Sequence, residues 1–394
     1  MAEVIDRVEL SGIAVLRDAI LKLDKPFRLE SGEPSFDVPL HIKEAIVRAL
    51  HDNKSHYVAS SGIPQLRQAV ADKCRSENRI PVGGPGEALI TNGGMHGLYC
   101  LFLSLIEPGD EILIPDPTWT SIQHLITLCG GVVKRVPLRE ARGWTFDPEE
   151  LRRAVTPRTR GLMLNSPHNP TGGMLSLSDL QEIAAIVDAH PDLTIISDEA
   201  YEHITFDGAE HVSFASLPGM YLRTASVFTL SKSYAMTGLR LGYVVSPDKL
   251  LMERMQKVAL YSATGISSIT QWGGLAALTG PQDCVVAFRD EYRARRDLFY
   301  DGVRRVPVFR GSPPKGAFYA FMRIADDWSA PDGRTGSWAM TEHLLKVKVG
   351  SAPGVIFGPS GEGYLRFSTA CDREDLTGAL EAMQALFAEV AVTA

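Results

Sequence analysis

The sequence predicts an α/β protein with two domains: a large domain with a mainly parallel seven-stranded sheet between helices, and a smaller α+β domain. Three observations support this class. Short β-branched runs alternate with helical patterns through the middle of the chain, as in strands joined by crossover helices. Near residue 280 this alternation gives way to a long charged helix and separate strand candidates. The length of 394 residues favours two domains over one.

The first predicted elements of the large sheet lie between residues 87 and 138. A strand at 87–91 precedes a buried helix that begins after a Gly-Gly pair, and a second strand follows at 110–116. A helix at 121–130 and a strand at 131–138 continue the alternation. We place the large domain at residues 46–280.

The alternation continues with a strand at 160–167, which ends in the loop "PHNPTGG". We expect the next helix to have Ser178 as its N-cap, because Gln181 follows three residues later and apolar residues then recur at helical spacing. Strands at 193–197 and 225–230 come next, each with polar residues just beyond its end.

The rest of the chain is predicted to form the smaller domain. It holds a long amphipathic helix, two strand candidates and a terminal helix, at 289–303, 316–324, 363–370 and 373–391. We place this domain at residues 281–394. Residues 1–45 are expected to pack with it, since the large sheet begins later in the chain.

Polar residues gather beyond the predicted strand ends. They are found in "NSPHNPTG" (165–172), "DEAY" (198–201) and "TLSK" (229–232), and a Gly-Gly pair opens the helix after the first strand. Ligands of parallel sheets bind beyond the carboxyl ends of the strands. The gathered groups include a lysine, an aspartate and a helix N-terminus that favours an anion such as phosphate.

The segments "NPTG", "SDEAY", "SKSYAMTGLRLGY" and "GYLRFS" occur in an order and spacing that resemble the fold-type I, pyridoxal-phosphate-dependent aminotransferases of class I/II. The resemblance runs from "GEPSFDVP" at 32–39 to "LRFS" at 365–368. One such segment alone is weak, since "NPTG" is an ordinary turn, but four or five in order are specific. The resemblance implies pyridoxal 5'-phosphate as the cofactor.

The resemblance assigns residues to the cofactor ring. Lys232 would bond the cofactor aldehyde and carry protons, which requires a lowered pKa. Asp198 would keep the pyridine nitrogen protonated, while Tyr201 and Asn169 would hydrogen-bond the phenolic oxygen and Trp119 would stack on the ring. Without the resemblance, other roles remain open. Lys232 could be a solvated lysine, Asp198 a helix N-cap, Asn169 a turn residue and Trp119 a core aromatic.

Other residues are assigned to the cofactor phosphate. The backbone N–H groups of Gly94 and Met95, the Thr229 hydroxyl and Arg240 would bind it, with Ser231 as a weaker candidate. Tyr57 matches a family tyrosine that contacts the phosphate of the neighbouring subunit. This match implies a homodimer with shared active sites, although a buried aromatic residue is the alternative.

Two positions are assigned to the substrate. Arg366, helped by Asn169, would bind the α-carboxylate as a bidentate guanidinium. An arginine within an apolar strand also calls for an anionic partner without the resemblance. Gly32 corresponds to a family glycine that lies against the substrate.

The resemblance implies transamination: the α-amino group of an L-amino acid moves to a 2-oxo acid, expected to be 2-oxoglutarate, by a ping-pong mechanism. A β-eliminating lyase or an oxidase- or synthase-type reaction needs the same lysine, aspartate and arginine, so both stay open. A non-enzymatic regulator with this fold is a third alternative, but the chain has no room for the DNA-binding domain that usually marks one.

Met95 stands where related aspartate and prephenate aminotransferases commonly carry a lysine. Because methionine is flexible and apolar, it favours neutral or aromatic amino acids as substrates.

Composition and charge exclude several other partners. The net charge of -7 gives no electrostatic reason to expect nucleic acid or an anionic membrane. The histidines show no metal-ligand spacing, and no G-x-G-x-x-G follows a strand, so neither a metal nor a dinucleotide is expected. The start "MAEVIDRVEL" is unlike a signal peptide, and the five cysteines form no C-x-x-C pair. We expect a cytoplasmic protein without a membrane span.

Overall fold

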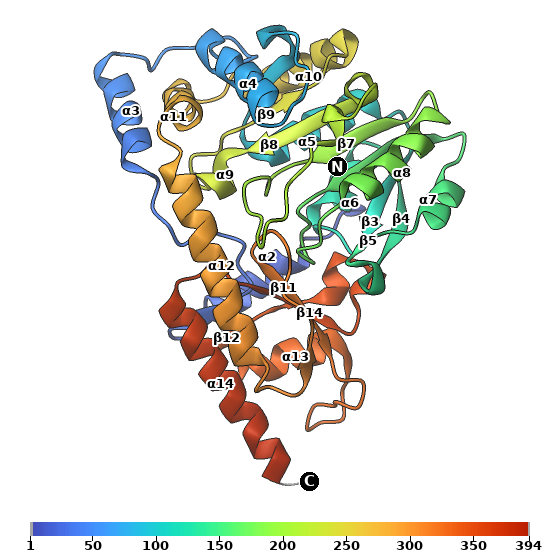
Figure 1. Cartoon of the computed structure of the whole chain (residues 1–394), viewed down its shortest axis with the longest axis vertical. Coiled ribbons are helices and arrows are strands. Elements are labelled where there is room, and N and C mark those ends of the chain that lie inside the picture. The colour runs from blue at the N-terminus through green and yellow to red at the C-terminus, as the bar shows by residue number, and fades with distance from the viewer. Residues whose placement is uncertain (1–2, 393–394) are drawn as a thin grey trace.

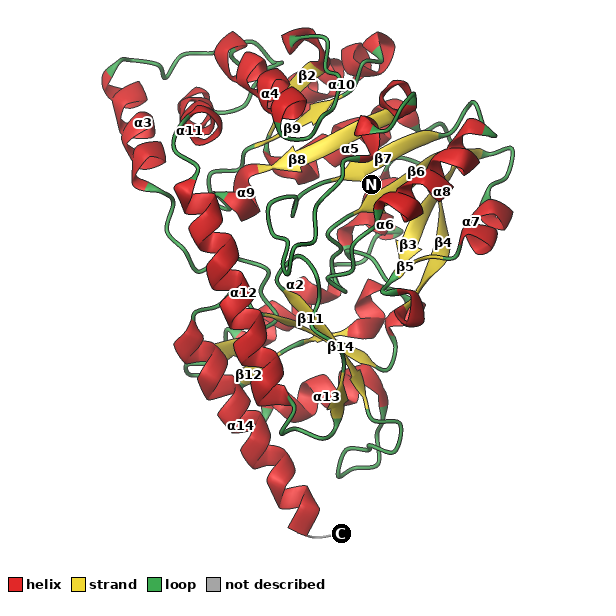
Figure 2. Ribbon diagram, in the orientation of Figure 1, coloured by secondary structure: helices red, strands yellow, loops and turns green. Residues whose placement is uncertain are grey.

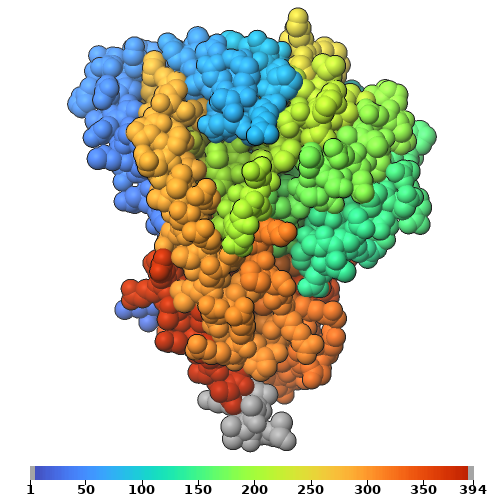
Figure 3. Space-filling view, in the orientation of Figure 1, coloured from blue at the N-terminus to red at the C-terminus, as the bar shows by residue number. Residues whose placement is uncertain are grey.

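The computed structural model describes residues 3–392 and shows two regions of different architecture (Figure 1). An eight-stranded sheet with its helices forms the upper region in this view, and a four-stranded sheet with its helices forms the lower one (Figure 2). Helix α12 (Asp283–Val303) runs from one region to the other. Its side chains form a continuous stripe on the surface in Figure 3.

The large sheet has the strand order β2-β9-β8-β7-β6-β3-β4-β5. Neighbours from β8 to β4 pair in parallel, whereas β9 is antiparallel to both β8 and β2. The mainly parallel α/β fold is therefore confirmed. The expected seven strands are one too few, because the two-residue β5 pairs with β4 and is too short to show a period. The strands are β2 (Ala88–Thr91), β3 (Glu111–Asp116), β4 (Val132–Arg139), β5 (Thr145–Phe146), β6 (Thr159–Asn165), β7 (Thr194–Asp198), β8 (Thr224–Thr229) and β9 (Gly242–Val245).

Helices cover both faces of this sheet. Successive strand residues point to opposite faces, so Ile112 and Ile114 pack with the α5, α6 and α10 side while Leu113 packs with α7 and α8. Helices α3, α4 and α11 pack over β2, β8 and β9. The helices are α3 (Leu40–His51), α4 (Pro64–Ser76), α5 (Gly93–Leu105), α6 (Ser121–Leu128), α7 (Pro148–Ala154), α8 (Leu177–Asp188), α9 (Leu230–Ser233), α10 (Lys249–Ala263) and α11 (Ser268–Thr279).

The N-cap of α8 is Ser176, so the expectation of Ser178 is wrong. The Ser176 hydroxyl accepts a hydrogen bond from the Asp179 N–H at 3.2 Å, and the Asp179 carboxylate accepts one from the Ser176 N–H at 2.8 Å. This reciprocal capping box satisfies two free donors of the helix start. Ser178 lies one residue inside the helix, where its hydroxyl is not needed as a cap.

The lower region is built on an antiparallel sheet of order β10-β11-β14-β13. Helices α12 and α14 pack on it through one apolar cluster that includes Phe299, Phe367 and Leu380. Its elements are β10 (Phe309–Arg310), β11 (Tyr319–Ile324), α13 (Gly336–Leu345), β12 (Val349–Gly350), β13 (Ala352–Pro353), β14 (Tyr364–Ser368) and α14 (Arg373–Val392).

The N-terminal segment contacts the lower region. It contains α1 (Glu3–Asp6), α2 (Gly12–Ile20) and β1 (Phe27–Arg28), and β1 pairs in parallel with β12. Leu16 and Ile20 of α2 pack with Phe321 and Phe357. The domain boundaries at residues 45 and 280 stay predictions. Among the described residues, no helix combines the length and apolar character needed to cross a membrane.

Candidate active site

A cavity of about 450 Å³ lies beyond the carboxyl ends of the central strands of the large sheet. Strands β6, β7 and β8 are neighbours and end at Asn165, Asp198 and Thr229, so parallel pairing brings their polar ends together. The lining includes every predicted site residue except Tyr57: Gly32, Gly94, Met95, Trp119, Asn169, Asp198, Tyr201, Thr229, Ser231, Lys232, Arg240 and Arg366.

Lys232 projects from the short helix α9, which follows β8 directly. The Thr229 side chain caps this helix by accepting from the Ser231 N–H. The Lys232 amine donates to the Gly32 carbonyl at 2.8 Å. Burial, together with the positive charge of Arg366, lowers the pKa of Lys232 to about 8. Lys232 therefore has the acidity that a nucleophilic amine needs near neutral pH, unlike a solvated lysine.

Asp198 is the last residue of β7. Its carboxylate accepts a hydrogen bond from the Ala200 N–H at 3.2 Å. Burial raises the pKa of Asp198 to about 7, and the charge of Lys232 offsets only part of this rise. A cation placed beside this carboxylate would hold it ionised, so the site fits a protonated pyridine nitrogen.

Three groups converge on the N-terminus of α5. Gly93 has a φ of +75°, and a Cβ built on it would lie 2.7 Å from a guanidinium nitrogen of Arg240. The Thr229 Cβ would lie 3.6 Å from a Cβ on Gly94, and the Thr229 hydroxyl is 2.9 Å from that of Ser231. A guanidinium, two hydroxyls and a helix N-terminus form a cradle that fits a phosphate dianion.

Arg366 of β14 is only 2% exposed. Its terminal nitrogens donate to the Asn169 side-chain oxygen at 3.0 Å and to the Glu30 carbonyl at 2.6 Å. Its Nε has no partner among the described residues. The guanidinium lies between the rings of Tyr319 and Phe357, at 4.5 and 4.9 Å. The donors of this buried cation suit a carboxylate ligand.

Tyr201 and Gly32 meet at Tyr319. The Tyr201 hydroxyl lies 2.9 Å from the Tyr319 hydroxyl and 3.5 Å from Nδ2 of Asn169. A Cβ on Gly32 would lie 2.4 Å from the Tyr319 hydroxyl oxygen, so a side chain there would displace Tyr319. This close approach explains the glycine at position 32 in this chain.

One wall of the cavity is apolar. Met95 and Trp119 line it and also pack against the buried cluster of α5 and α6. The two interpretations of Trp119, a core aromatic and a ring facing the cofactor, are therefore compatible.

Tyr57 does not line the cavity and is 94% exposed. The alternative of a buried aromatic residue is wrong. Its contact with a neighbouring subunit stays a prediction.

Sequence reasoning did not assign about half of the cavity lining. Tyr319 was read only as part of a strand, and Arg17 and Arg28 of the N-terminal segment carried no motif. No sequence signal marked Arg28, because the two-residue strand β1 that carries it is too short to show a period. The unassigned lining residues are Ile13, Arg17, Arg28, Glu30, Ser31, Glu33, Leu98, Asn165, Ala200, Phe228, Thr237 and Tyr319.

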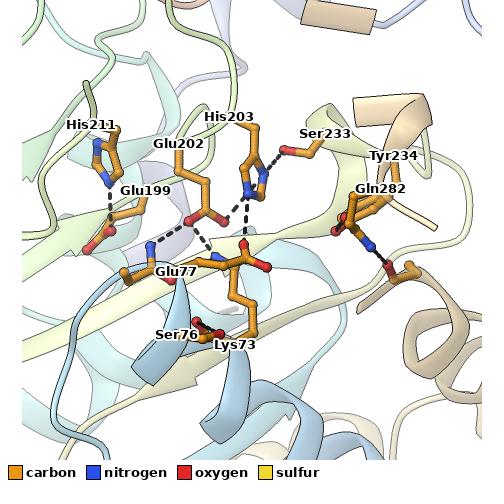
Figure 4. A network of polar contacts seen from close by, with 12 residues as sticks. Lys73, Ser76, Glu77, Glu199, Glu202, His203, His211, Ser233, Tyr234 and Gln282 are labelled. Carbon is orange, nitrogen blue, oxygen red and sulfur yellow. Dashed lines mark hydrogen bonds and ion pairs between the residues drawn. The ribbon is translucent and has the colours of Figure 1, made fainter. Parts of the chain in front are cut away.

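Sequence analysis also missed a polar network that includes the residues next to Asp198 and Lys232 in the chain (Figure 4). Lys73 of α4 bonds the Glu202 carboxylate at 2.5 Å and the Asn78 side-chain oxygen at 2.8 Å. His203 bonds the hydroxyl of Ser233, the residue after Lys232, at 2.9 Å.

The same network anchors Glu199, the residue after Asp198. Its carboxylate is 2.9 Å from Nε2 of His211 and accepts from the Ser197 hydroxyl at 3.0 Å. The residues that follow Lys232 and Asp198 are thus both held by hydrogen bonds of this network.

The sequence model of a family described as "Aminotransferase class I and II" matches residues 24–383. The chain belongs to the class I and II aminotransferases.

Known relatives agree with this assignment of the aminotransferase. It is 37% identical to the "Aspartate aminotransferase" of Pyrococcus abyssi, covering 100% of both chains. It is 36% identical to the "Aromatic-amino-acid aminotransferase 2" of Thermococcus litoralis, covering 98% of both. A solved structure of the Thermus thermophilus aspartate aminotransferase with maleate matches with a TM-score of 0.91 at 35% identity, covering 98% of this chain and 99% of that one.

These findings confirm the predicted fold and enzyme class. The aminotransferase belongs to a family that uses pyridoxal phosphate and acts on amino acids and 2-oxo acids. The aminotransferase names of its relatives favour transamination over the lyase, oxidase and synthase alternatives.

Proposed function

We propose that this aminotransferase binds pyridoxal 5'-phosphate and moves the α-amino group of an L-amino acid to 2-oxoglutarate by a ping-pong mechanism. One observation carries the proposal: the Lys232 amine shares a single cavity with the Asp198 carboxylate, the anion cradle of α5 and the buried guanidinium of Arg366.

The residues present fit each part of the cofactor. Asp198 would face the pyridine nitrogen, Tyr201 and Asn169 the phenolic oxygen, and Trp119 the face of the ring. The cradle of Gly94, Met95, Thr229, Ser231 and Arg240 would hold the phosphate. When bound, pyridoxal phosphate supplies an aldehyde and an electron-withdrawing ring that makes the α-proton of an amino acid removable.

Lys232 would be the proton carrier. Its pKa of about 8 leaves a usable fraction of neutral amine at neutral pH. Nζ takes the proton that leaves the substrate α-carbon and delivers it within the same cavity, without an exchange with bulk water. A protonated pyridine nitrogen would hold the buried Asp198 carboxylate ionised, and this negative charge would stabilise positive charge on the ring side of the cavity.

Arg366 would orient the substrate. Its guanidinium binds the α-carboxylate, with the Asn169 side chain beside it, and this fixes the α-carbon relative to Lys232. Gly32 leaves room for the substrate where any Cβ would displace Tyr319.

We infer that neutral or aromatic amino acids are the preferred amino donors. Support comes from the apolar wall of Met95, Leu98 and Trp119 together with Ile13 of α2. Arg17 and Arg28 also line the cavity and are 55% and 35% exposed at their side chains. Arg28 pairs with the buried Glu30 carboxylate at 2.8 Å and Arg17 contacts Asp18 at 3.4 Å. Both arginines would supply positive charge for the distal carboxylate of 2-oxoglutarate in the second half of the reaction.

The deciding experiment is a screen of the twenty amino acids with 2-oxoglutarate as acceptor, in which glutamate formation is measured. We expect activity with neutral or aromatic donors and a weaker response to aspartate. The Lys232→Ala variant is the control and should lose turnover together with the cofactor absorbance band. Substantial activity in that variant would contradict the assignment of Lys232. Formation of pyruvate and thiol, or of peroxide, without an added 2-oxo acid would instead support the lyase or oxidase alternative.

A further inference from the structure

We propose that Tyr319 is a positioning residue whose hydroxyl donates a hydrogen bond to Tyr201 when Tyr201 donates to the cofactor. The inference rests on the proposed function, because it takes Tyr201 to face the phenolic oxygen of pyridoxal phosphate. Tyr319 would then strengthen the hydrogen bond by which Tyr201 stabilises negative charge on that oxygen.

The two hydroxyls form a buried pair between the two regions of the molecule, and Nδ2 of Asn169 also lies 3.5 Å from the Tyr201 oxygen, as a longer contact. Tyr201 follows β7 of the large sheet, and Tyr319 begins β11 of the small sheet. They are 5% and 2% exposed, and their oxygens are 2.9 Å apart. Their rings meet edge to face, at 5.7 Å and 78°. Burial raises the pKa of both phenols, so both hydroxyls keep their protons at neutral pH.

The number of hydroxyl protons decides which tyrosine donates in the Tyr201–Tyr319 hydrogen bond. Each tyrosine hydroxyl has one proton to donate and can accept in return. Once Tyr201 directs its proton to an acceptor in the cavity, its own oxygen can still accept from Tyr319. A hydroxyl that accepts while it donates is a stronger donor, because the two hydrogen bonds polarise each other.

Contacts on other sides hold the Tyr319 ring in place. The Arg366 guanidinium stacks 4.5 Å from its centroid, and its hydroxyl lies against Gly32. The backbone at Tyr319 pairs with Ser368 of β14. The hydroxyl therefore approaches Tyr201 in a fixed direction, and the same ring supports the proposed carboxylate ligand.

The test is Tyr319→Phe, which removes the hydroxyl but keeps the ring beneath Arg366. We expect the pH midpoint of the cofactor absorbance change in the holoenzyme to rise by about half a unit. Without the Tyr319 hydroxyl, the negative charge on the phenolic oxygen is less stabilised. That oxygen then holds the proton whose loss gives the midpoint more tightly. The dissociation constant of the cofactor for the apoenzyme should rise about threefold, while KM for the amino acid changes little because the ring under Arg366 remains.

Tyr292→Phe is the matched control. Tyr292 is also a fully buried tyrosine, but its hydroxyl has no hydrogen-bond partner among the described residues and it does not line the cavity. Removal of the Tyr292 hydroxyl should leave the midpoint of the cofactor absorbance change where it is in the wild type. A shift of equal size in both variants would overturn the proposal, because it would reflect a general effect on packing.

Two further measurements complete the test. In a Tyr201→Phe background, Tyr319→Phe should add no further shift, since the intermediary is gone. If Tyr319→Phe does not fold, 3-fluorotyrosine incorporated at position 319 makes the phenol a stronger donor, and the midpoint should fall instead of rise. An unchanged midpoint with either replacement, in a protein that binds the cofactor normally, would overturn the role of Tyr319. A wild-type chain that shows no cofactor absorbance would instead contradict the proposed function.

Discussion

At the scale of single residues, burial explains the chemistry of the cavity. Lys232 and Asp198 sit in the same desolvated space, where the pKa of the amine falls to about 8 and that of the carboxyl rises to about 7. Both shifts have the same cause, since a low-dielectric site disfavours the charged form of either group. Perturbed pairs of this kind are typical of functional sites.

The pKa of Lys232 leads to a pH-dependent prediction for the apoenzyme. The rate of covalent cofactor attachment depends on the neutral amine, so it should rise about tenfold from pH 7 to pH 9 and then level off. An ordinary lysine would give a rate that still climbs steeply above pH 9. Stopped-flow measurement of the absorbance band decides between these profiles, with Lys232→Ala as the blank.

Sequence analysis expected Lys232, Asp198 and Asn169 to lie in one site, and the structure places all three in one cavity, while their roles stay predictions. Lys232, Asp198 and Asn169 could be placed because the polar residues after parallel strands meet at one edge of the sheet. Tyr319 could not, because its role depends on the pairing of β11 with β14 and on its approach to Gly32, far away in the sequence.

At the scale of elements, polar contacts join α4 and α9 to the segment that follows β7. Lys73 of α4 and Glu202 form a buried ion pair, and His203 next to Glu202 bonds Ser233 of α9. The pairing lowers the pKa of Glu202 to about 2 despite its burial, and raises that of Lys73. These residues carry no motif, so pattern analysis had no means of finding them.

We predict that Lys73→Met destabilises the fold by about 3–5 kcal/mol at pH 7, because it leaves the buried Glu202 carboxylate without its cation. The double variant Lys73→Met/Glu202→Gln should be more stable than the single one, since it removes the unpaired charge. Denaturant unfolding of the apoenzymes measures both free energies. A single variant as stable as the wild type would show that the pair contributes nothing to the fold.

The same pair predicts acid sensitivity in the wild type. The pKa of Glu202 in the folded state lies below its ordinary value of 4.5, so its contribution is complete above that pH and is lost as the pH falls through about 2. The Lys73→Met/Glu202→Gln variant should lose less stability over this range than the wild type.

The element boundaries also show the limits of prediction from pattern. The α8 helix was found from its apolar spacing, but its N-cap is Ser176, two residues before the expected Ser178, because patterns place helix ends only to within one or two residues. The β5 strand was missed because two residues cannot show an alternation.

At the scale of the whole molecule, two exposed aromatic side chains bear on assembly. Tyr57 is 94% exposed, and Tyr261 of α10 is 86% exposed. Tyrosine is enriched at protein–protein interfaces, so these two side chains are candidates for an interface. We propose a homodimer in the cytoplasm in which Tyr57 reaches the phosphate cradle of the partner.

Hybrid dimers test this arrangement. Tyr57→Phe alone should raise the dissociation constant of the cofactor several-fold. In a hybrid of one Tyr57→Phe subunit and one Lys232→Ala subunit, the site with an intact Lys232 would receive an intact Tyr57 from its partner. That site should bind the cofactor as the wild type does. If it binds as weakly as the Tyr57→Phe homodimer, Tyr57 serves its own subunit and the predicted exchange is wrong.

The bond from the Lys232 amine to the Gly32 carbonyl joins residues 200 positions apart in the sequence. One partner belongs to the upper region and the other to the segment that packs on the lower region. The reaction rate therefore depends on how these two parts of the chain are positioned relative to each other. A variant that shifts one part by less than an ångström could keep its secondary structure and thermal stability yet lose most of its rate. In this enzyme, activity would therefore detect a misplacement of the two parts more sensitively than secondary structure or thermal stability does.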